Sequence, residues 1–250
     1  MQTVLITGCS SGFGLETAHL FLERGWQVVA TMRTPRTDVL PHSEHLRVLP
    51  MDVTDADSVR QAVAAAGHID VLVNNAGFGA GSPVELTSMD TARALLETNT
   101  LGTLSTMQAV LPQFRARRAG VIVNVTSSVT LKPLPIVGLY RASKMAVNAM
   151  SESLAVELAP LGVRVHVVLP GRAPSTQFGE NARAHMQGFD HPDYAPMIQS
   201  FMQSVLQDSG PVTEAADVAE AVWKAATEPN SPLRMAAGAD AEQWLAEVAV

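Results

Sequence analysis

The chain contains little of what marks several specialised classes of protein. Cys9 is the one cysteine among 250 residues, so no intramolecular disulfide can form, and a cytoplasmic location is expected. No apolar run reaches the ~18 residues that a membrane span needs, and MQTVLITG at 1–8 lacks the basic and long apolar segments of a signal peptide. We therefore expect no association with a membrane.

Basic clusters and metal-ligand patterns are also scarce. The net charge is −7, and the densest basic cluster, RARR at 115–118, is more typical of the solvated end of a helix than of a nucleic-acid-binding patch. The seven histidines show neither HExxH nor another metal-ligand spacing. We expect no nucleic-acid partner and no metal site.

Short apolar runs alternate with amphipathic helical segments along the whole chain. Strands are predicted at 3–7, 27–31, 46–50, 69–75, 120–127, 162–170 and 233–237, and helices at 15–24, 56–66, 89–118, 139–161 and 215–227. This alternation predicts an α/β fold, a doubly wound parallel sheet in a three-layer α/β/α sandwich. With no internal repeat and no linker, residues 1–250 are interpreted as a single domain.

One stretch, 172–210, has no clear periodicity and is rich in Gly, Pro, Asn, Gln, Met and Phe. A segment of that length between regular elements is often a lid or a binding loop, and the alternative is a helical excursion packed on the surface. We interpret it as a substrate-binding lid. The apolar residues that could line a pocket are Phe178, Met186, Phe189 and Met197.

The glycine-rich stretch TGCSSGFG at 7–14 lies between the first predicted strand and the first predicted helix. Parallel sheets bind ligands at the carboxyl ends of their strands, where helix N-termini offer free amides to phosphate. Gly8, Gly12 and Gly14 would allow a tight turn and a close approach to a pyrophosphate. The spacing G-x-x-x-G-x-G is not the commoner G-x-G-x-x-G, and three glycines could also form a plain turn. The position after a buried first strand favours nucleotide binding.

The end of the second predicted strand, ATMRTP at 30–35, bears on the choice of nucleotide. An acidic residue there favours a free ribose 2′-hydroxyl, whereas a basic residue favours a 2′-phosphate. Met32 occupies the acidic slot and Arg33 follows it, so we predict NADP(H) in preference to NAD(H), with Arg36 as a possible helper. The alternative is that Arg33 is only an exposed loop arginine.

The stretch YRASK at 140–144 places a tyrosine and a lysine four residues apart in a helix that is otherwise apolar. Positions i and i+4 lie on the same face of a helix, so Tyr140 and Lys144 can point into one small volume. The spacing alone fits either a packing accident or a proton donor with a cation beside it.

Six motifs occur together in the order and spacing of one family. They are TGCSSGFG, NNAG at 74–77, Asn99 in NTLG, Ser127 in NVTSS, YRASK, and PG at 170–171. On these residues the chain resembles the short-chain dehydrogenase/reductase family up to about residue 175, and beyond it only in outline. The resemblance implies a Rossmann-like fold and a nicotinamide-dependent oxidoreductase.

The resemblance implies a role for each matched position. Tyr140 would be the general acid/base, Lys144 its activator and a ribose ligand, and Ser127 the group that orients the substrate oxygen. Asn99 would kink the long helix and hold a water in a proton relay, and Asp52 would contact adenine. With Arg33 included, the expected cofactor-binding residues are Gly8, Ser10, Ser11, Gly12, Phe13, Gly14, Arg33, Asp52, Val53, Asn75, Ala76, Gly77, Tyr140, Lys144, Pro170, Gly171, Ala173 and Ser175.

Elementary chemistry supports these roles. Hydride transfer to a carbonyl leaves a developing alkoxide that needs a proton, but the ordinary tyrosine pKa of ~10 is too high for efficient exchange at neutral pH. We expect the Lys144 ammonium to lower the pKa of Tyr140. The Ser127 hydroxyl can donate a hydrogen bond to the oxygen where charge develops.

The sequence also departs from the family pattern. Thr130 stands where the serine loop usually carries a glycine, and Ser128 is adjacent to Ser127, although the spacing favours Ser127. After PG the usual threonine is displaced, so that Ser175 and Thr176 are both candidates for contacting the carboxamide.

The expected function is an NADP(H)-dependent oxidoreductase that interconverts an alcohol and a ketone or aldehyde. The apolar stretch 172–210, with Phe78 and Leu134, favours a steroid-like, retinoid-like, aliphatic or aromatic substrate. A non-catalytic NADP(H)-sensing regulator is the alternative, although such proteins commonly lose the tyrosine or lysine. A lyase such as a halohydrin dehalogenase would carry arginine in place of Lys144. The helices at 89–118 and 139–161 suggest a homodimer or homotetramer.

Overall fold

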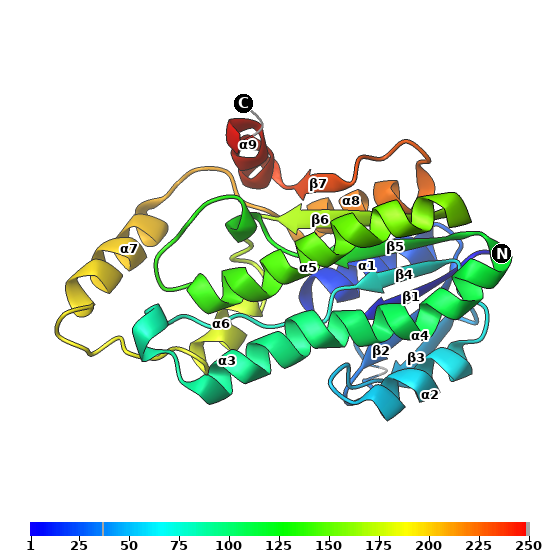
Figure 1. The fold of residues 1–250 in the computed structure, drawn as a ribbon, viewed down its shortest axis with the longest axis horizontal. Helices are drawn as coiled ribbons and strands as arrows, with labels where there is room; N and C mark the ends of the chain where they lie inside the picture. Colours follow the sequence, from blue (N-terminus) through cyan, green and yellow to red (C-terminus); the bar gives the residue numbers. More distant parts are fainter. Residues whose placement is uncertain (37, 249–250) are drawn as a thin grey trace.

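The computed structural model describes residues 1–36 and 38–248, and it centres on a seven-stranded sheet (Figure 1). The strands are β1 (Thr3–Thr7), β2 (Gln27–Met32), β3 (Leu46–Pro50), β4 (Val71–Asn74), β5 (Gly120–Val125), β6 (Val163–Pro170) and β7 (Arg234–Ala237). Their order is β3-β2-β1-β4-β5-β6-β7, and every neighbouring pair is parallel. The order reverses between β1 and β4, where doubly wound sheets bind their ligands.

Helices cover both faces of the sheet and confirm the predicted three-layer α/β fold. On one face lie α2 (Ala56–Ala66), α4 (Gly102–Arg117) and α5 (Gly138–Leu158), and on the other lie α1 (Gly12–Glu23) and α8 (Ala215–Thr227). Figure 1 shows α4 and α5 in front of the strands and α1 behind them.

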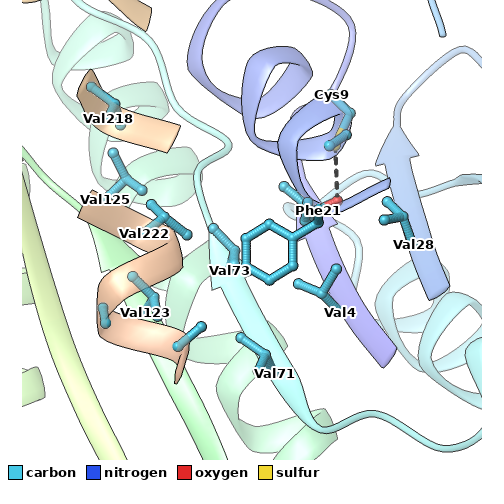
Figure 2. Close-up of a cluster of buried hydrophobic side chains, with 14 of the residues drawn as sticks. Val4, Cys9, Phe21, Val28, Val71, Val73, Val123, Val125, Val218 and Val222 are labelled. Carbon is cyan, nitrogen blue, oxygen red and sulfur yellow. Dashed lines mark hydrogen bonds between the residues drawn. The ribbon is translucent and has the colours of Figure 1, made fainter. Parts of the chain in front are cut away.

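Alternation along the strands divides the core into two clusters. Because successive side chains point to opposite faces, Val4 and Ile6 pack under α1 and α8 whereas Leu5 packs under the α2–α4 layer. Figure 2 shows the first cluster, with Phe21 of α1 among valines of β1, β2 and β4 and with Val222 of α8 nearby. A strand buried on both faces must be apolar throughout, which is why these strands read as continuous apolar runs.

Helix caps follow the sequence closely. Asp55 caps α2 by accepting hydrogen bonds from the amides of Asp57 and Ser58, and Ser88 caps α3 (Met89–Leu95) by accepting one from Thr91. Aspartate and serine are among the residue types preferred at an N-cap, so both caps are readable from the sequence. These side chains fix helix starts at the ends of loops that border the site.

Some element boundaries differ from prediction for local reasons. α1 begins at Gly12 rather than Leu15, because the glycine loop itself forms the first turn of the helix. The long helix predicted at 89–118 is divided into α3, a π-helical segment at Leu96–Leu101, and α4. A final helix, α9 (Ala239–Val248), was not predicted.

The irregular stretch 172–210 contains two helices, α6 (Phe178–Arg183) and α7 (Ala195–Gln207). Figure 1 shows both beyond the carboxyl ends of the strands, with α6 close to α3 and α5. The helical excursion that the sequence left open is therefore present, and it lies at the edge of the sheet where ligands bind. Among the described residues, no helix has the length and apolar character to cross a bilayer.

Candidate active site

A cleft of about 750 Å³ opens at the carboxyl ends of the strands, where the strand order reverses. The loops after β1, β2, β3 and β4 line one side, and Tyr140 and Lys144 of α5 line another. The segment 176–185, which includes α6, covers part of it. The cleft brings together most of the predicted cofactor-binding residues: Gly8, Ser10, Ser11, Gly12, Phe13, Arg33, Asp52, Val53, Asn75, Ala76, Gly77, Tyr140 and Lys144.

The glycine loop forms a cradle that side chains would fill. Gly8 and Gly12 adopt positive φ angles of 74° and 57°, a region that L-residues rarely occupy. A Cβ on Gly14 would lie 2.4 Å from both the Gly8 carbonyl oxygen and Asn75 Nδ2. The Asn75 amide closes the turn by donating hydrogen bonds to the carbonyl oxygens of Thr7 and Gly8, at 3.0 and 3.1 Å.

The start of α1 is suited to an anion. The N-cap residue, Ser11, makes no side-chain capping hydrogen bond, so the first amides of the helix have no side-chain partner at the cap. Such a helix N-terminus binds phosphate groups. Together with the glycine cradle, this geometry fits the pyrophosphate of a dinucleotide.

The opposite end of the cleft is shaped by Met32, Arg33 and Asp52. The amide and hydroxyl of Thr54 donate hydrogen bonds to the Asp52 carboxylate, at 3.0 and 2.8 Å. These bonds, the amide first, and the nearby charge of Arg33 lower the pKa of Asp52. Arg36 is paired with Asp38 at 3.0 Å and does not line the cleft, which leaves Arg33 as its basic side chain at this end.

Tyr140 and Lys144 lie one turn apart on α5 and both line the cleft, as their spacing predicted. Burial raises the pKa of Tyr140 to about 12, and a hydrogen bond with Ser127 opposes this rise. Burial lowers the pKa of Lys144 to about 8. The Lys144 ammonium donates a hydrogen bond to the Val125 carbonyl oxygen at 3.1 Å.

These values correct the expectation that Lys144 lowers the pKa of Tyr140. Burial dominates because only 7% of Tyr140 and 6% of Lys144 are exposed, and a charged group loses hydration when it is buried. The protein therefore holds Tyr140 as a neutral phenol, the form that can give a proton.

Asn99 is fully buried in the π-helical segment between α3 and α4. Its side chain accepts a hydrogen bond from the Phe78 amide at 3.0 Å and donates to the Phe78 carbonyl and to Ser143 Oγ, at 2.9 and 3.0 Å. A π-turn is a common device at functional sites. Here it lets Asn99 connect α5 to the turn after β4, although Asn99 itself does not line the cleft.

Ser127 lies just after β5 and is largely buried. Its hydroxyl accepts a hydrogen bond from the Val129 amide at 3.3 Å, and its proximity to Tyr140 opposes the rise in the pKa of that phenol. Ser127 is not among the residues that line the cleft. Thr130, the departure from the family pattern, donates its hydroxyl to the Ser127 carbonyl oxygen at 2.7 Å. The threonine thus closes the serine loop with a side-chain hydrogen bond that a glycine could not make.

The residues predicted beyond β6 are placed differently. Pro170, Gly171, Ala173 and Ser175 do not line the cleft, and neither does Gly14. A Cβ on Gly171 would meet the Asp240 carboxylate at 2.2 Å, and the Ser175 hydroxyl donates to Glu214 at 2.8 Å. Gly171 and Ser175 thus contact other parts of the protein rather than the cleft. The side chain of Thr176 faces the cleft beside Gly12.

Phe78 and Phe178, which the sequence predicted to line a substrate pocket, both line the cleft. Several other lining residues were not predicted individually: Met51, Thr54, Ala94, Thr98, Thr126, Gln177, Glu180, Asn181, Ala184 and His185. Ala94 and Thr98 are spaced i, i+4 just before Asn99, a signal that could have found them. A six-residue helix such as α6 has too few turns to show a helical period.

Comparison with known proteins gives consistent matches. A family model described as short chain dehydrogenase matches residues 2–187. A 3-ketodihydrosphingosine reductase of Bacteroides thetaiotaomicron is 34% identical, over 98% of this chain and 93% of the relative. Human retinol dehydrogenase 8 is 38% identical, over 68% of this chain and 58% of the relative.

Solved structures agree with the sequence comparison. A short-chain dehydrogenase from Streptomyces avermitilis superposes with a TM-score of 0.86 and is 32% identical, covering 98% of this chain and 91% of the other. A short chain dehydrogenase from Burkholderia cenocepacia, solved in complex with NADP, gives a TM-score of 0.79 and 28% identity, covering 100% and 95%.

Proposed function

Because this chain belongs to the short-chain dehydrogenase family, we propose that it is an NADP(H)-dependent oxidoreductase that interconverts an alcohol and a ketone or aldehyde. The observation that carries the proposal is the meeting of Tyr140 and Lys144 in the nucleotide-sized cleft, with Ser127 close enough to Tyr140 to affect its pKa. In this proposal the protein is an alcohol dehydrogenase or a carbonyl reductase.

A nicotinamide nucleotide held in the cleft by the glycine loop, Tyr140 and Lys144 would supply a hydride to a carbonyl carbon, or would take one from an alcohol. In reduction, Tyr140 donates its phenolic proton to the carbonyl oxygen as negative charge develops there. Ser127 donates a hydrogen bond that holds the same oxygen in place. Lys144, whose pKa of about 8 is near physiological pH, provides a positive charge beside the phenolate and a route for its reprotonation.

The preference for NADP(H) over NAD(H) rests on the end of β2. Met32 and Arg33 line the cleft there, and a guanidinium suits a 2′-phosphate better than a 2′-hydroxyl. Solved relatives that carry NADP support the choice. Arg33 is thus the proposed phosphate ligand, and Asp52 the proposed contact to adenine.

The substrate in this proposal is apolar. Phe78 and Phe178 line the cleft, and the Phe178 ring packs against Tyr140, so part of the space beside Tyr140 is bounded by aromatic groups. Relatives named for a ketodihydrosphingosine and for retinol support this class. Steroid-like, retinoid-like, aliphatic and aromatic carbonyls all belong to it.

The wider organisation is part of the same proposal. Residues 1–250 form one domain in which 172–210 is the substrate lid, and Cys9, a buried thiol, fits a reducing cytoplasm. We propose a homodimer or homotetramer whose subunits pair through α4 and α5. An apolar groove between these helices is lined by Leu104, Met107, Leu111, Ala149, Met150, Ser153, Leu154 and Glu157.

The deciding experiment is turnover of a panel of apolar ketones and aldehydes with NADPH, with Tyr140→Phe as the matched variant. The variant keeps the ring but has no proton to give, so its rate should fall by about 100-fold or more, while NADPH still binds. Retention of most activity would reject the mechanism. Tight NADPH binding without turnover of any substrate would favour a non-catalytic regulator instead.

A further inference from the structure

The segment after β4 lies directly against side chains of the lid, most closely at Gly79. A Cβ on Gly79 would lie 2.7 Å from Phe178 Cζ, and one on Gly81 would contact Met186 Cγ at 3.6 Å and Phe189 Cζ at 3.8 Å. Side chains of the lid therefore lie directly against the backbone of the segment 79–81. A side chain larger than hydrogen at Gly79 would displace the Phe178 ring.

The Phe178 ring also packs against the proposed proton donor. The ring centroids of Phe178 and Tyr140 are 5.6 Å apart, and their planes are inclined by 54°. Both rings line the cleft, but Phe178 is 39% exposed and Tyr140 only 7%. The Phe178 ring thus stands between Tyr140 and solvent, beside the space that a reacting carbonyl must enter.

Hydrogen bonds of Gln187, near the other end of α6, hold the lid and the Phe178 ring in position. The Gln187 side chain accepts a hydrogen bond from the Ser88 amide at 2.8 Å and donates to Thr91 Oγ1 at 3.0 Å, at the start of α3. The backbone amide of Gln187 also donates a hydrogen bond to the Gly81 carbonyl oxygen at 3.0 Å. Because α6 lies between this anchor and the end of β6, the position of Phe178 is defined rather than free.

We propose that Phe178 controls access to Tyr140 and thereby determines the size of the group that the reacting carbonyl can carry. The inference rests on the proposed oxidoreductase function for its substrate class, but the access step concerns Tyr140 alone. A compact apolar carbonyl fits beside the ring, whereas a polycyclic one must displace it.

The access step can be tested without turnover because the chain has only two tyrosines. In a Tyr194→Phe background, tetranitromethane can nitrate only Tyr140, and peptide mass spectrometry gives the rate. Phe178→Ala should make nitration several times faster. Gly179→Ala is the matched control, since a Cβ there meets nothing within 4 Å and should leave the rate unchanged. An unchanged rate in Phe178→Ala overturns the inference.

The selectivity step uses cyclohexanone and a polycyclic ketone with NADPH. Phe178→Ala should raise kcat/KM for the polycyclic ketone relative to cyclohexanone by about tenfold, the scale of one hydrophobic contact in a pocket. The comparison of the two ketones at saturating NADPH removes any effect on the cofactor, and thermal stability should stay close to wild type because Phe178 is 39% exposed. An unchanged ratio overturns the inference while leaving the oxidoreductase function standing.

The proposed function can also fail while the proposed role of Phe178 stands. If wild type reduces neither ketone nor any other carbonyl of the panel, yet Phe178→Ala speeds nitration, the proposed function fails and the control of access by Phe178 is supported. Gly79→Ala gives an internal check, because its added Cβ meets the Phe178 ring and should change the nitration rate of Tyr140 only while that ring is present. The double variant should therefore be nitrated at the rate of Phe178→Ala alone.

Discussion

Burial acts on the two central side chains in opposite directions. It raises the pKa of Tyr140 and lowers that of Lys144, so both groups are moved toward their neutral forms. A neutral phenol is ready to give a proton, and an amine with a pKa of about 8 can take and release one near neutral pH. The same desolvation that costs stability therefore prepares both groups for proton transfer.

The first prediction concerns stability against pH. The pKa of Lys144 is about 8 in the folded chain against 10.5 for a free lysine. Between these values the unfolded chain binds one more proton than the folded chain, so unfolding becomes harder as pH rises, by at most about 1.4 kcal/mol per pH unit. Below pH 8 both states hold the proton and this dependence vanishes.

Urea unfolding at pH 7 to 9.5 measures the effect. The wild-type free energy of unfolding should rise across the upper part of this range relative to Lys144→Met, which has no ammonium to bury. Parallel curves for the two proteins would show that Lys144 keeps an ordinary pKa in the fold.

The second prediction concerns Arg33. If it binds the 2′-phosphate, Arg33→Ala should weaken NADPH by about tenfold to a hundredfold, the scale of a charged hydrogen bond, and leave NADH within about twofold. Fluorescence titration of each nucleotide measures this. Arg36→Ala is the matched control, because Arg36 is paired with Asp38 outside the cleft and should change little. Equal losses for both nucleotides would remove Arg33 from phosphate recognition.

At the scale of elements, the π-helical segment and the lid have complementary tasks. The π turn buries Asn99 against Phe78 and Ser143, and so ties α5 to the turn after β4. The lid is then fastened to the same region by Gln187 at the start of α3. The position of Phe178 over Tyr140 is therefore built from three segments far apart in the sequence.

The third prediction tests the fastening of the lid. Gln187→Ala removes three side-chain hydrogen bonds to the start of α3, so the segment 172–210 should open more often and be cut faster by a protease at low concentration. The melting temperature should change little, because the core is untouched. Gln199→Ala, at an exposed site on α7, is the control. Equal cleavage of both variants and wild type would show that the anchor lies elsewhere.

At the scale of the whole molecule, the reversal of strand order brings the residues of the site together at one edge of the sheet. β1 and β4 are neighbours in the sheet although 63 residues separate Thr7 from Asp70, so the glycine loop and the turn after β4 meet at one edge. α4 and α5 cover the same face of the sheet and leave the apolar groove between them, which we propose as the subunit interface. The site faces away from that groove at the carboxyl edge of the strands.

The fourth prediction tests this interface. Ala149 is exposed and lines the groove, so Ala149→Arg should place a charge in an apolar contact and shift the protein toward monomer. Ala64→Arg, at an exposed site on α2, is the matched control. Analytical ultracentrifugation reads the result. An unchanged sedimentation coefficient in Ala149→Arg would place the contact on another surface.

The sequence predicted whatever is repeated locally or fixed by short spacing. Short apolar runs predicted the strands, most clearly those of the sheet centre, which are buried on both faces. The i, i+4 spacing of Tyr140 and Lys144 predicted that both would line one cleft. The caps Asp55 and Ser88 were also predictable, because a cap depends on a few adjacent residues.

Tertiary structure decided what depends on distant partners. The sequence offered both Ser175 and Thr176 as polar contacts to the cofactor, but the Ser175 hydroxyl donates to Glu214, whereas Thr176 faces the cleft. The pKa of Tyr140 rises because side chains from several elements exclude water, a burial that no motif encodes. Phe178 reaches Tyr140 only because Gly79 leaves room for its ring. Local sequence patterns thus determined the helices, the strands and the identity of the reacting groups. Packing between remote segments determined the protonation of those groups and which side chains cover them.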